Sequence, residues 1–69
     1  MNTINPWGLS PRQFRAMKNL AEQGENKKVA KVMAISVRTV EEYLKASYAR
    51  MGAGNRITAV LMFDRWDRE

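Results

Sequence analysis

Only three residues, 34–36, separate two segments whose apolar residues recur at helical spacing. The segment before them, residues 26–33, is short and combines apolar residues with lysines. The segment after them, residues 37–51, follows Ser36, a residue type that caps helices. Two helices joined by about three residues must cross steeply, and this arrangement is the helix-turn-helix unit. The spacing therefore predicts a helix-turn-helix pair over residues 26–51.

The longer segment of this pair has two distinct sides. Its apolar stripe, which we expect to face the core, consists of Val37, Val40, Leu44, Tyr48 and Met51. Its outward stripe consists of Arg38, Glu41, Glu42, Lys45 and Ala49. Residues three and four apart are neighbours on a helix surface, so each stripe forms one continuous face.

Two further helices are expected around the pair. Ser10, followed three residues later by Gln13, is typical of a capping box, so a first helix begins there and ends at Gly24. A fourth helix is expected from about residue 55 to about residue 66. Because 69 residues suffice for one domain only, we expect an all-α fold of four helices.

The fourth segment also predicts a partner chain, because residues 57–63 leave almost no polar face. A helix that is apolar all round must be buried on more than one side, and so small a domain cannot cover both. The chain has no cysteine and no histidine, so neither disulfides nor the usual zinc ligands can stabilise it. We therefore expect a homodimer with an interface of Ala59, Leu61, Met62, Phe63 and Trp66. The alternative for Phe63 and Trp66 is that they close the core of the monomer.

The positive charge of the chain is unevenly distributed. Residues 10–56 carry ten Lys or Arg and four Glu, a net charge of +6, whereas residues 57–69 have a net charge of −1. A basic domain of this size attracts polyanions, either nucleic acid or an anionic membrane surface. A membrane surface is disfavoured because the basic and apolar residues do not form one long amphipathic helix. The remaining alternative is that the charge only keeps a small protein soluble.

Enzymes and membrane-spanning proteins are disfavoured by the same sequence. The acidic residues are scattered, and neither a glycine-rich phosphate loop nor a serine with a nearby base is present. We therefore expect no catalytic residue, no metal and no cofactor. No apolar run approaches the roughly 20 residues that a membrane span needs. The N-terminus also lacks the features of a secretory signal, so we expect a cytoplasmic protein.

Seven short stretches within residues 9–60 lie in register with one known pattern: Leu9–Arg12, Leu20–Glu22, Asn26–Ala30, Ile35–Val40, Arg50–Gly52, Asn55–Arg56 and Ala59–Val60. Together they resemble the LuxR/GerE-type helix-turn-helix domain of bacterial transcription factors. The resemblance implies a bacterial or phage transcriptional regulator whose third helix, about 37–51, lies in the major groove of double-stranded DNA. It also implies that the second helix braces the third and that the fourth forms a dimer.

The resemblance further bears on domain organisation. Members of this family commonly carry a receiver or small-molecule-sensing domain ahead of the module, and only about eight residues precede it here. We therefore expect a stand-alone regulator with an N-terminal arm, 1–8, and a helix-turn-helix domain, 9–69, that includes the dimerisation helix. Trp7 is expected to pack the arm back onto the domain.

The resemblance assigns roles to the outward stripe of the third helix. It places Glu41, Glu42 and Lys45 at positions that face bases, and Arg38 and Thr39 nearer the phosphates. Lysine and arginine can bind guanine, and glutamate can accept a hydrogen bond from cytosine N4. The alternative is a solvated face in which Glu41 and Lys45 form an i,i+4 ion pair.

The first two helices supply basic residues that suit phosphate contacts. Lys27, Lys28 and Lys31 lie on the second helix, and Arg12 and Arg15 on the first. Such contacts orient a protein on DNA without recognising sequence. The resemblance places Arg12 and Lys27 at positions of this kind, whereas for Lys31 and Arg15 a generic basic surface is an equal alternative.

The two adjacent glutamates leave a second function open. Each repels phosphate, so they either give selectivity or weaken DNA binding. In the second case the chain would pair with a full-length regulator and act as a protein-binding antagonist or co-regulator. The sequence also departs from the family at Tyr43, commonly His, at Ser47, usually apolar, and at Gln23-Gly24, where the glycine is displaced by one residue.

Overall fold

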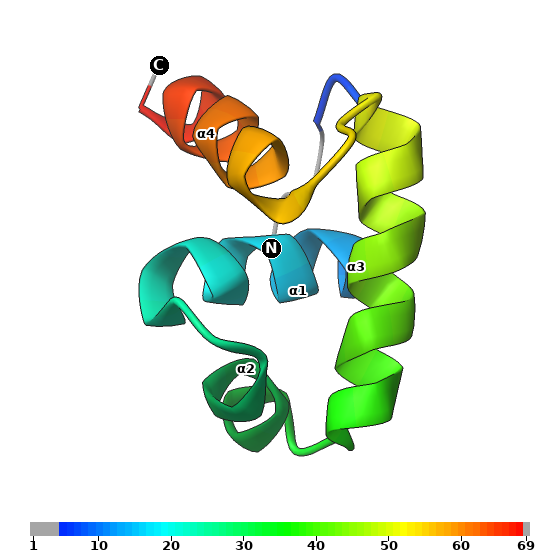
Figure 1. The fold of residues 1–69 in the computed structure, drawn as a ribbon, viewed down its shortest axis with the longest axis vertical. Helices are drawn as coiled ribbons and strands as arrows, with labels where there is room; N and C mark the ends of the chain where they lie inside the picture. Colours follow the sequence, from blue (N-terminus) through cyan, green and yellow to red (C-terminus); the bar gives the residue numbers. More distant parts are fainter. Residues whose placement is uncertain (1–4, 69) are drawn as a thin grey trace.

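The computed structural model describes residues 5–68, and this part of the chain forms four helices and no strand. They are α1, Pro11–Gln23, α2, Asn26–Met33, α3, Val37–Met51, and α4, Arg56–Asp67. In Figure 1, α1 lies across the middle, α2 and α4 lie on opposite sides of it, and α3 runs along all three. The all-α fold with a helix-turn-helix pair is confirmed.

Three of the four helices begin at a side-chain cap. The Ser10 hydroxyl accepts a hydrogen bond from the Gln13 N–H at 3.2 Å, and the Gln13 side chain accepts one from the Ser10 N–H at 3.0 Å. This is the predicted capping box. Ser36 caps α3 by accepting the Thr39 N–H at 3.1 Å, and Asn55 caps α4 in the same way. The caps explain why these helices begin where the sequence predicted.

Helix α2 lacks comparable local support. Its N-cap residue, Glu25, makes no side-chain capping hydrogen bond, and the side-chain oxygen of Asn26 is buried without a hydrogen-bond partner in the described chain. At its other end Ala34 adopts a left-handed conformation with φ 57°. Among residues 5–68 it is the only non-glycine residue with positive φ, a conformation that favours glycine. Helix α2 is therefore held mainly by packing.

The core gathers one face of each helix. Its fully enclosed apolar side chains include Met17 and Leu20 from α1, Val29 from α2, Val40 and Leu44 from α3, and Ala59 and Phe63 from α4. Helix α1 packs against all three other helices, whereas α4 contacts α1 and, less extensively, α3. This arrangement leaves one side of α3 and one side of α4 uncovered.

Two residues of α3 differ from the expectation for the core. Ser47, which stands where an apolar residue is usual, is fully buried, and its hydroxyl donates to the Tyr43 carbonyl at 2.7 Å. The burial of this polar group is therefore compensated by a hydrogen bond within the helix. Val37 was expected in the inward stripe, but 37% of its surface is exposed, so that expectation was wrong. It is the first residue of α3, at the edge of the core.

The N-terminal arm packs against α4 from residue 5 onward. The Asn5 side-chain oxygen accepts the backbone N–H groups of Trp7 at 3.1 Å and of Leu9 at 2.9 Å. The Trp7 ring lies 6.1 Å from the Phe63 ring and 5.5 Å from the Trp66 ring, centroid to centroid. Trp7 thus fastens the arm to the domain as expected. The remaining residues of the predicted arm, 1–4, and the C-terminal residue 69 lie outside the described part.

Candidate nucleic-acid interface

The outward side of α3 brings four charged side chains together. Arg38, Glu41, Glu42 and Lys45 are exposed and line one shallow hollow on the surface. They share this hollow because they stand three and four residues apart on one helix. The opposite side of the helix is anchored by Val40 and Leu44, which are buried. Helix α3 therefore presents a charged face on a fixed support.

The charges on this face are only loosely paired. The Arg38 Nε lies 3.9 Å from a carboxylate oxygen of Glu42, and the two side chains are 87% and 68% exposed. An ion pair so exposed contributes little stability, so Arg38 can exchange Glu42 for a phosphate at little cost. Within residues 5–68 no ion pair joins Glu41 to Lys45, the pairing that the alternative interpretation offered.

Thr39 lies at the edge of this face and is half-buried. Its N–H donates to the Ser36 hydroxyl, and the hydroxyls of the two residues lie 2.9 Å apart. The residue therefore takes part in capping α3. The start of a helix carries a partial positive charge, which favours a phosphate near this position.

The basic residues predicted on the first two helices are exposed. Arg12 lies in the first turn of α1, and Lys27 and Lys28 lie on α2 beside the buried Val29. None of these three cations is paired with an acidic residue of the described chain. They are therefore free to bind an anion.

Two other arginines of the basic segment are engaged by the fold itself. Arg50 donates to the Gly8 carbonyl at 3.3 Å and ties α3 to the arm. Arg56 donates to the Gly24 carbonyl and ties the start of α4 to the end of α1. Burial raises the pKa of Tyr48, and the positive charge of Arg56 partly opposes this rise. These two arginines thus serve structure, which the sequence alone did not show.

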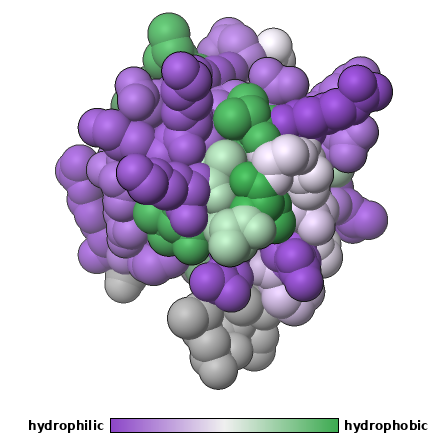
Figure 2. Space-filling view, turned by 90° about the horizontal axis from the view of Figure 1, so that it is seen from below, coloured by the Kyte–Doolittle hydropathy of each residue, from purple (hydrophilic) through white to green (hydrophobic). Residues whose placement is uncertain are grey.

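Exposed apolar residues flank the turn between α2 and α3, and the sequence did not predict them as part of the site. Val32 is 53% exposed at the end of α2, and Val37 stands at the start of α3. Figure 2 views this end of the molecule and shows a hydrophobic area surrounded by hydrophilic residues. Apolar periodicity did not reveal the exposure of Val37. Periodicity gives the angular position of a residue around the helix, but it does not show whether the core extends as far as the helix end.

The apolar run of α4 divides into two sides. Ala59 and Phe63, predicted at the dimer interface, are 0% exposed and belong to the chain's own core. They are therefore unavailable to a second chain. Ile57 and Leu61, also four residues apart, are 73% and 62% exposed. Met62 and Trp66 are half-buried and lie between the two sides.

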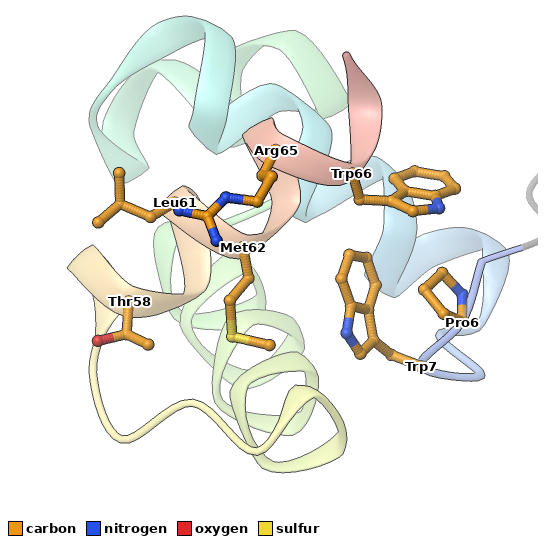
Figure 3. A pocket seen from close by; sticks show the side chains of 7 residues that line it. All are labelled: Pro6, Trp7, Thr58, Leu61, Met62, Arg65 and Trp66. Carbon is orange, nitrogen blue, oxygen red and sulfur yellow. The ribbon is translucent and has the colours of Figure 1, made fainter. Parts of the chain in front are cut away.

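A groove runs between this exposed side of α4 and the arm (Figure 3). It encloses about 470 Å³ and is lined by Pro6 and Trp7 from the arm and by Thr58, Leu61, Met62, Arg65 and Trp66 from α4. Most of its lining is apolar. The three remaining residues predicted at an interface, Leu61, Met62 and Trp66, thus share one surface feature.

The comparison with protein families identifies the domain. A family model described as bacterial regulatory proteins, luxR family, matches residues 8–63, about four-fifths of the chain. The chain belongs to the luxR family. No match was found among curated proteins or among solved structures. The resemblance noted in the sequence is thereby confirmed.

Membership in the luxR family places the chain in the general class of DNA-binding transcription regulators. The match spans all of α1, α2 and α3 and ends at Phe63, the buried aromatic residue of α4. It therefore includes the charged face of α3 and the turn before it. Separately, no helix within residues 5–68 is long and apolar enough to cross a membrane.

Proposed function

We propose that the chain binds a specific sequence in double-stranded DNA as a homodimer, with α3 in the major groove, and thereby regulates transcription in the cytoplasm. One observation carries the proposal: the exposed face of α3 that Arg38, Glu41, Glu42 and Lys45 form. An α-helix fits the major groove, where the base pairs present distinguishable donors and acceptors. The regulator acts by binding and catalyses no reaction.

The base contacts come from the middle of this face. Lys45 donates to guanine O6 or N7, and Glu41 and Glu42 accept from cytosine N4. Their exposure leaves these groups accessible to base edges. The carboxylates also repel the phosphates of non-cognate DNA, which favours selectivity over affinity.

The phosphate contacts come from the borders of the face and from the neighbouring helices. Arg12, Lys27, Lys28, Arg38 and Thr39 fill this role. Three of these, Arg12, Lys27 and Lys28, are cations without an acidic partner in the described chain, and Arg38 is held only by a long, exposed pair. These contacts orient α3 in the groove and supply most of the salt-dependent affinity.

The homodimer forms through the exposed side of α4. The apolar side chains of Ile57 and Leu61 are mostly exposed to water in the isolated chain. A second copy would cover them, and the burial of this apolar surface would stabilise the dimer. A two-fold interface is self-complementary, so Leu61 of each chain can enter the groove of the other, between Met62 and Trp66. Two copies then bind a pseudo-palindromic site whose half-sites lie about one helical turn apart.

A selection of bound duplexes from a random pool, performed at two salt concentrations, tests this function. We expect one enriched, pseudo-palindromic sequence and a steep loss of affinity for it as salt rises. The Lys45→Ala variant should enrich a less defined sequence from the same pool. A pool without any enriched sequence would contradict specific DNA binding.

The alternative function rests on one specific observation. In the chain without DNA, Glu42 forms an ion pair with Arg38, and Glu41 adds a second exposed carboxylate to the same face. If these carboxylates weaken DNA binding, the exposed side of α4 would pair with a full-length regulator and antagonise it. Under this alternative, replacing either glutamate strengthens binding to all DNA sequences alike.

A further inference from the structure

Val37 is the large apolar residue of α3 that remains exposed, and it directly precedes Arg38 of the charged face. It is exposed, and Glu41 stands one turn further along, four residues away. Residues at this spacing are neighbours on a helix surface. The N-terminal residues of a recognition helix are the ones that contact base edges. If α3 enters the groove as proposed, the exposed part of Val37, at the N-terminal end of the helix and one turn before Glu41, therefore lies within reach of the bases.

The charges near Val37 in the sequence and on α2 favour a polyanion over a protein as the partner that contacts Val37. Arg38 follows it directly, and across the turn α2 exposes Lys28 and Lys31. Helix α2 contains no acidic residue. An exposed apolar residue on a surface rich in cations suits a partner that carries negative charge and also offers an apolar group.

The major groove offers one apolar group, the C5-methyl of thymine. We infer that Val37 contacts the methyl group of a thymine in each half-site and so determines specificity at that position. The inference rests on the proposed function, because it requires α3 to lie in the major groove. It adds an apolar contact to a face otherwise expected to recognise bases through charge.

The spacing on the helix also limits where this thymine lies. Four residues advance an α-helix by about 6 Å. Successive base pairs lie about 3.4 Å apart along the duplex. The thymine therefore lies within about two base pairs of the base that Glu41 contacts.

Replacing single thymines by deoxyuridine tests the contact, because the exchange removes the methyl group alone. In the selected duplex, the exchange at one position should weaken binding by the wild-type protein. The expected loss is about fourfold, which is the contribution of one buried methyl group. Val37→Ala should weaken binding to the thymine duplex by a similar factor. It should show no further loss when that thymine becomes deoxyuridine.

Val32→Ala is the matched control, since Val32 is also an exposed valine but lies on α2. The Val32→Ala variant should lose as much affinity as the wild type when that thymine becomes deoxyuridine. Circular dichroism of both variants verifies that they fold. The inference is overturned if every deoxyuridine exchange affects the wild type and Val37→Ala equally, or if the selected half-site has no thymine within this distance. A pool without an enriched sequence contradicts the proposed function itself, which is a different result.

Discussion

The two ends of the molecule are built from different kinds of side chain. At the end formed by α4 and the arm, three aromatic residues, Trp7, Phe63 and Trp66, pack together with ring centroids between 5.5 and 6.1 Å apart. At the end formed by α2 and the start of α3, the enclosed side chains are aliphatic, such as Val29 and Val40. Exposed aliphatic residues occur at both ends, but at the second they share the surface with lysines that form no ion pair within residues 5–68.

This difference indicates a division of roles. The aromatic end makes large buried contacts and leaves an apolar side of α4 exposed, which suits stability and assembly. The aliphatic end supports a charged surface on a less well capped helix, because α2 has no side-chain N-cap and ends at a non-glycine residue in the left-handed conformation. On our proposal, the first end joins two copies and the second end contacts DNA. Single substitutions at either end test whether the two ends can be altered separately.

The largest expected effect is on stability at the aromatic end. Phe63→Ala removes a fully buried ring and should lower the free energy of unfolding by about 3–5 kcal/mol. Small domains have only about 5–15 kcal/mol in total, so the variant should be largely unfolded on mild heating. Leu61→Ala, at an exposed position of the same helix, should lose under about 1 kcal/mol at low protein concentration. Urea titrations followed by circular dichroism measure both values, and equal losses would refute the division of α4 into two sides.

The next effect concerns assembly. Leu61→Glu places a charge on the exposed side of α4 and should yield a folded monomer, whereas the same change at Val32 should leave the dimer intact. Loss of the second copy should reduce affinity for a duplex with both half-sites by about a hundredfold or more. Sedimentation equilibrium measures the oligomeric state. A wild-type monomer at high concentration would disprove the proposed interface.

A smaller effect is expected on the salt dependence of DNA binding. Lys28→Ala should reduce the slope of log K against log salt by about one unit, since one phosphate contact is lost. Lys18→Ala is the control, because the Lys18 amine already lies 3.9 Å from Glu22 and 3.7 Å from Asp67. Anisotropy titrations across a salt series give both slopes. An unchanged slope for Lys28→Ala would remove this residue from the phosphate contacts.

The smallest expected effect is on the free energy of unfolding when the caps of α2 are changed. Glu25→Ser would introduce a capping hydroxyl, and Ala34→Gly would relieve the left-handed conformation. Each should raise the free energy of unfolding by about 0.5–1 kcal/mol. Ser36→Ala, which removes an existing cap, should lower it by about 1 kcal/mol. Thermal melts measure all three, and a lower melting temperature for Glu25→Ser would contradict the assignment of α2 as the weakly capped helix.

The start and the buried face of α3 could be predicted because the signals there are local. Ser36 and the three-residue turn define where α3 begins, and apolar periodicity defines its buried face. The charged stripe could be predicted for the same reason. Arg38, Glu41 and Lys45 occur together on one exposed side, as their spacing requires.

The two sides of α4 could not be predicted, because a segment that is apolar all round has no periodicity to orient it. Only the packing against α1 shows that Phe63 is enclosed while Leu61 is exposed. The contact of Arg50 with Gly8 was likewise hidden, since it joins residues 42 positions apart in the sequence. The exposure of Val37 depends on where the core ends, which is a property of the assembled helices.

The two glutamates of α3 distinguish base recognition by this face from a face that only weakens DNA binding. The measurement compares Glu41→Ala and Glu42→Ala with the wild type on the selected duplex and on a scrambled duplex of the same composition. We expect each variant to lose about 1–3 kcal/mol of binding free energy on the selected duplex. On the scrambled duplex, binding should stay level or rise slightly, because a negative charge near phosphate has been removed. A uniform gain on both duplexes, with no loss on the selected one, would contradict base recognition by α3.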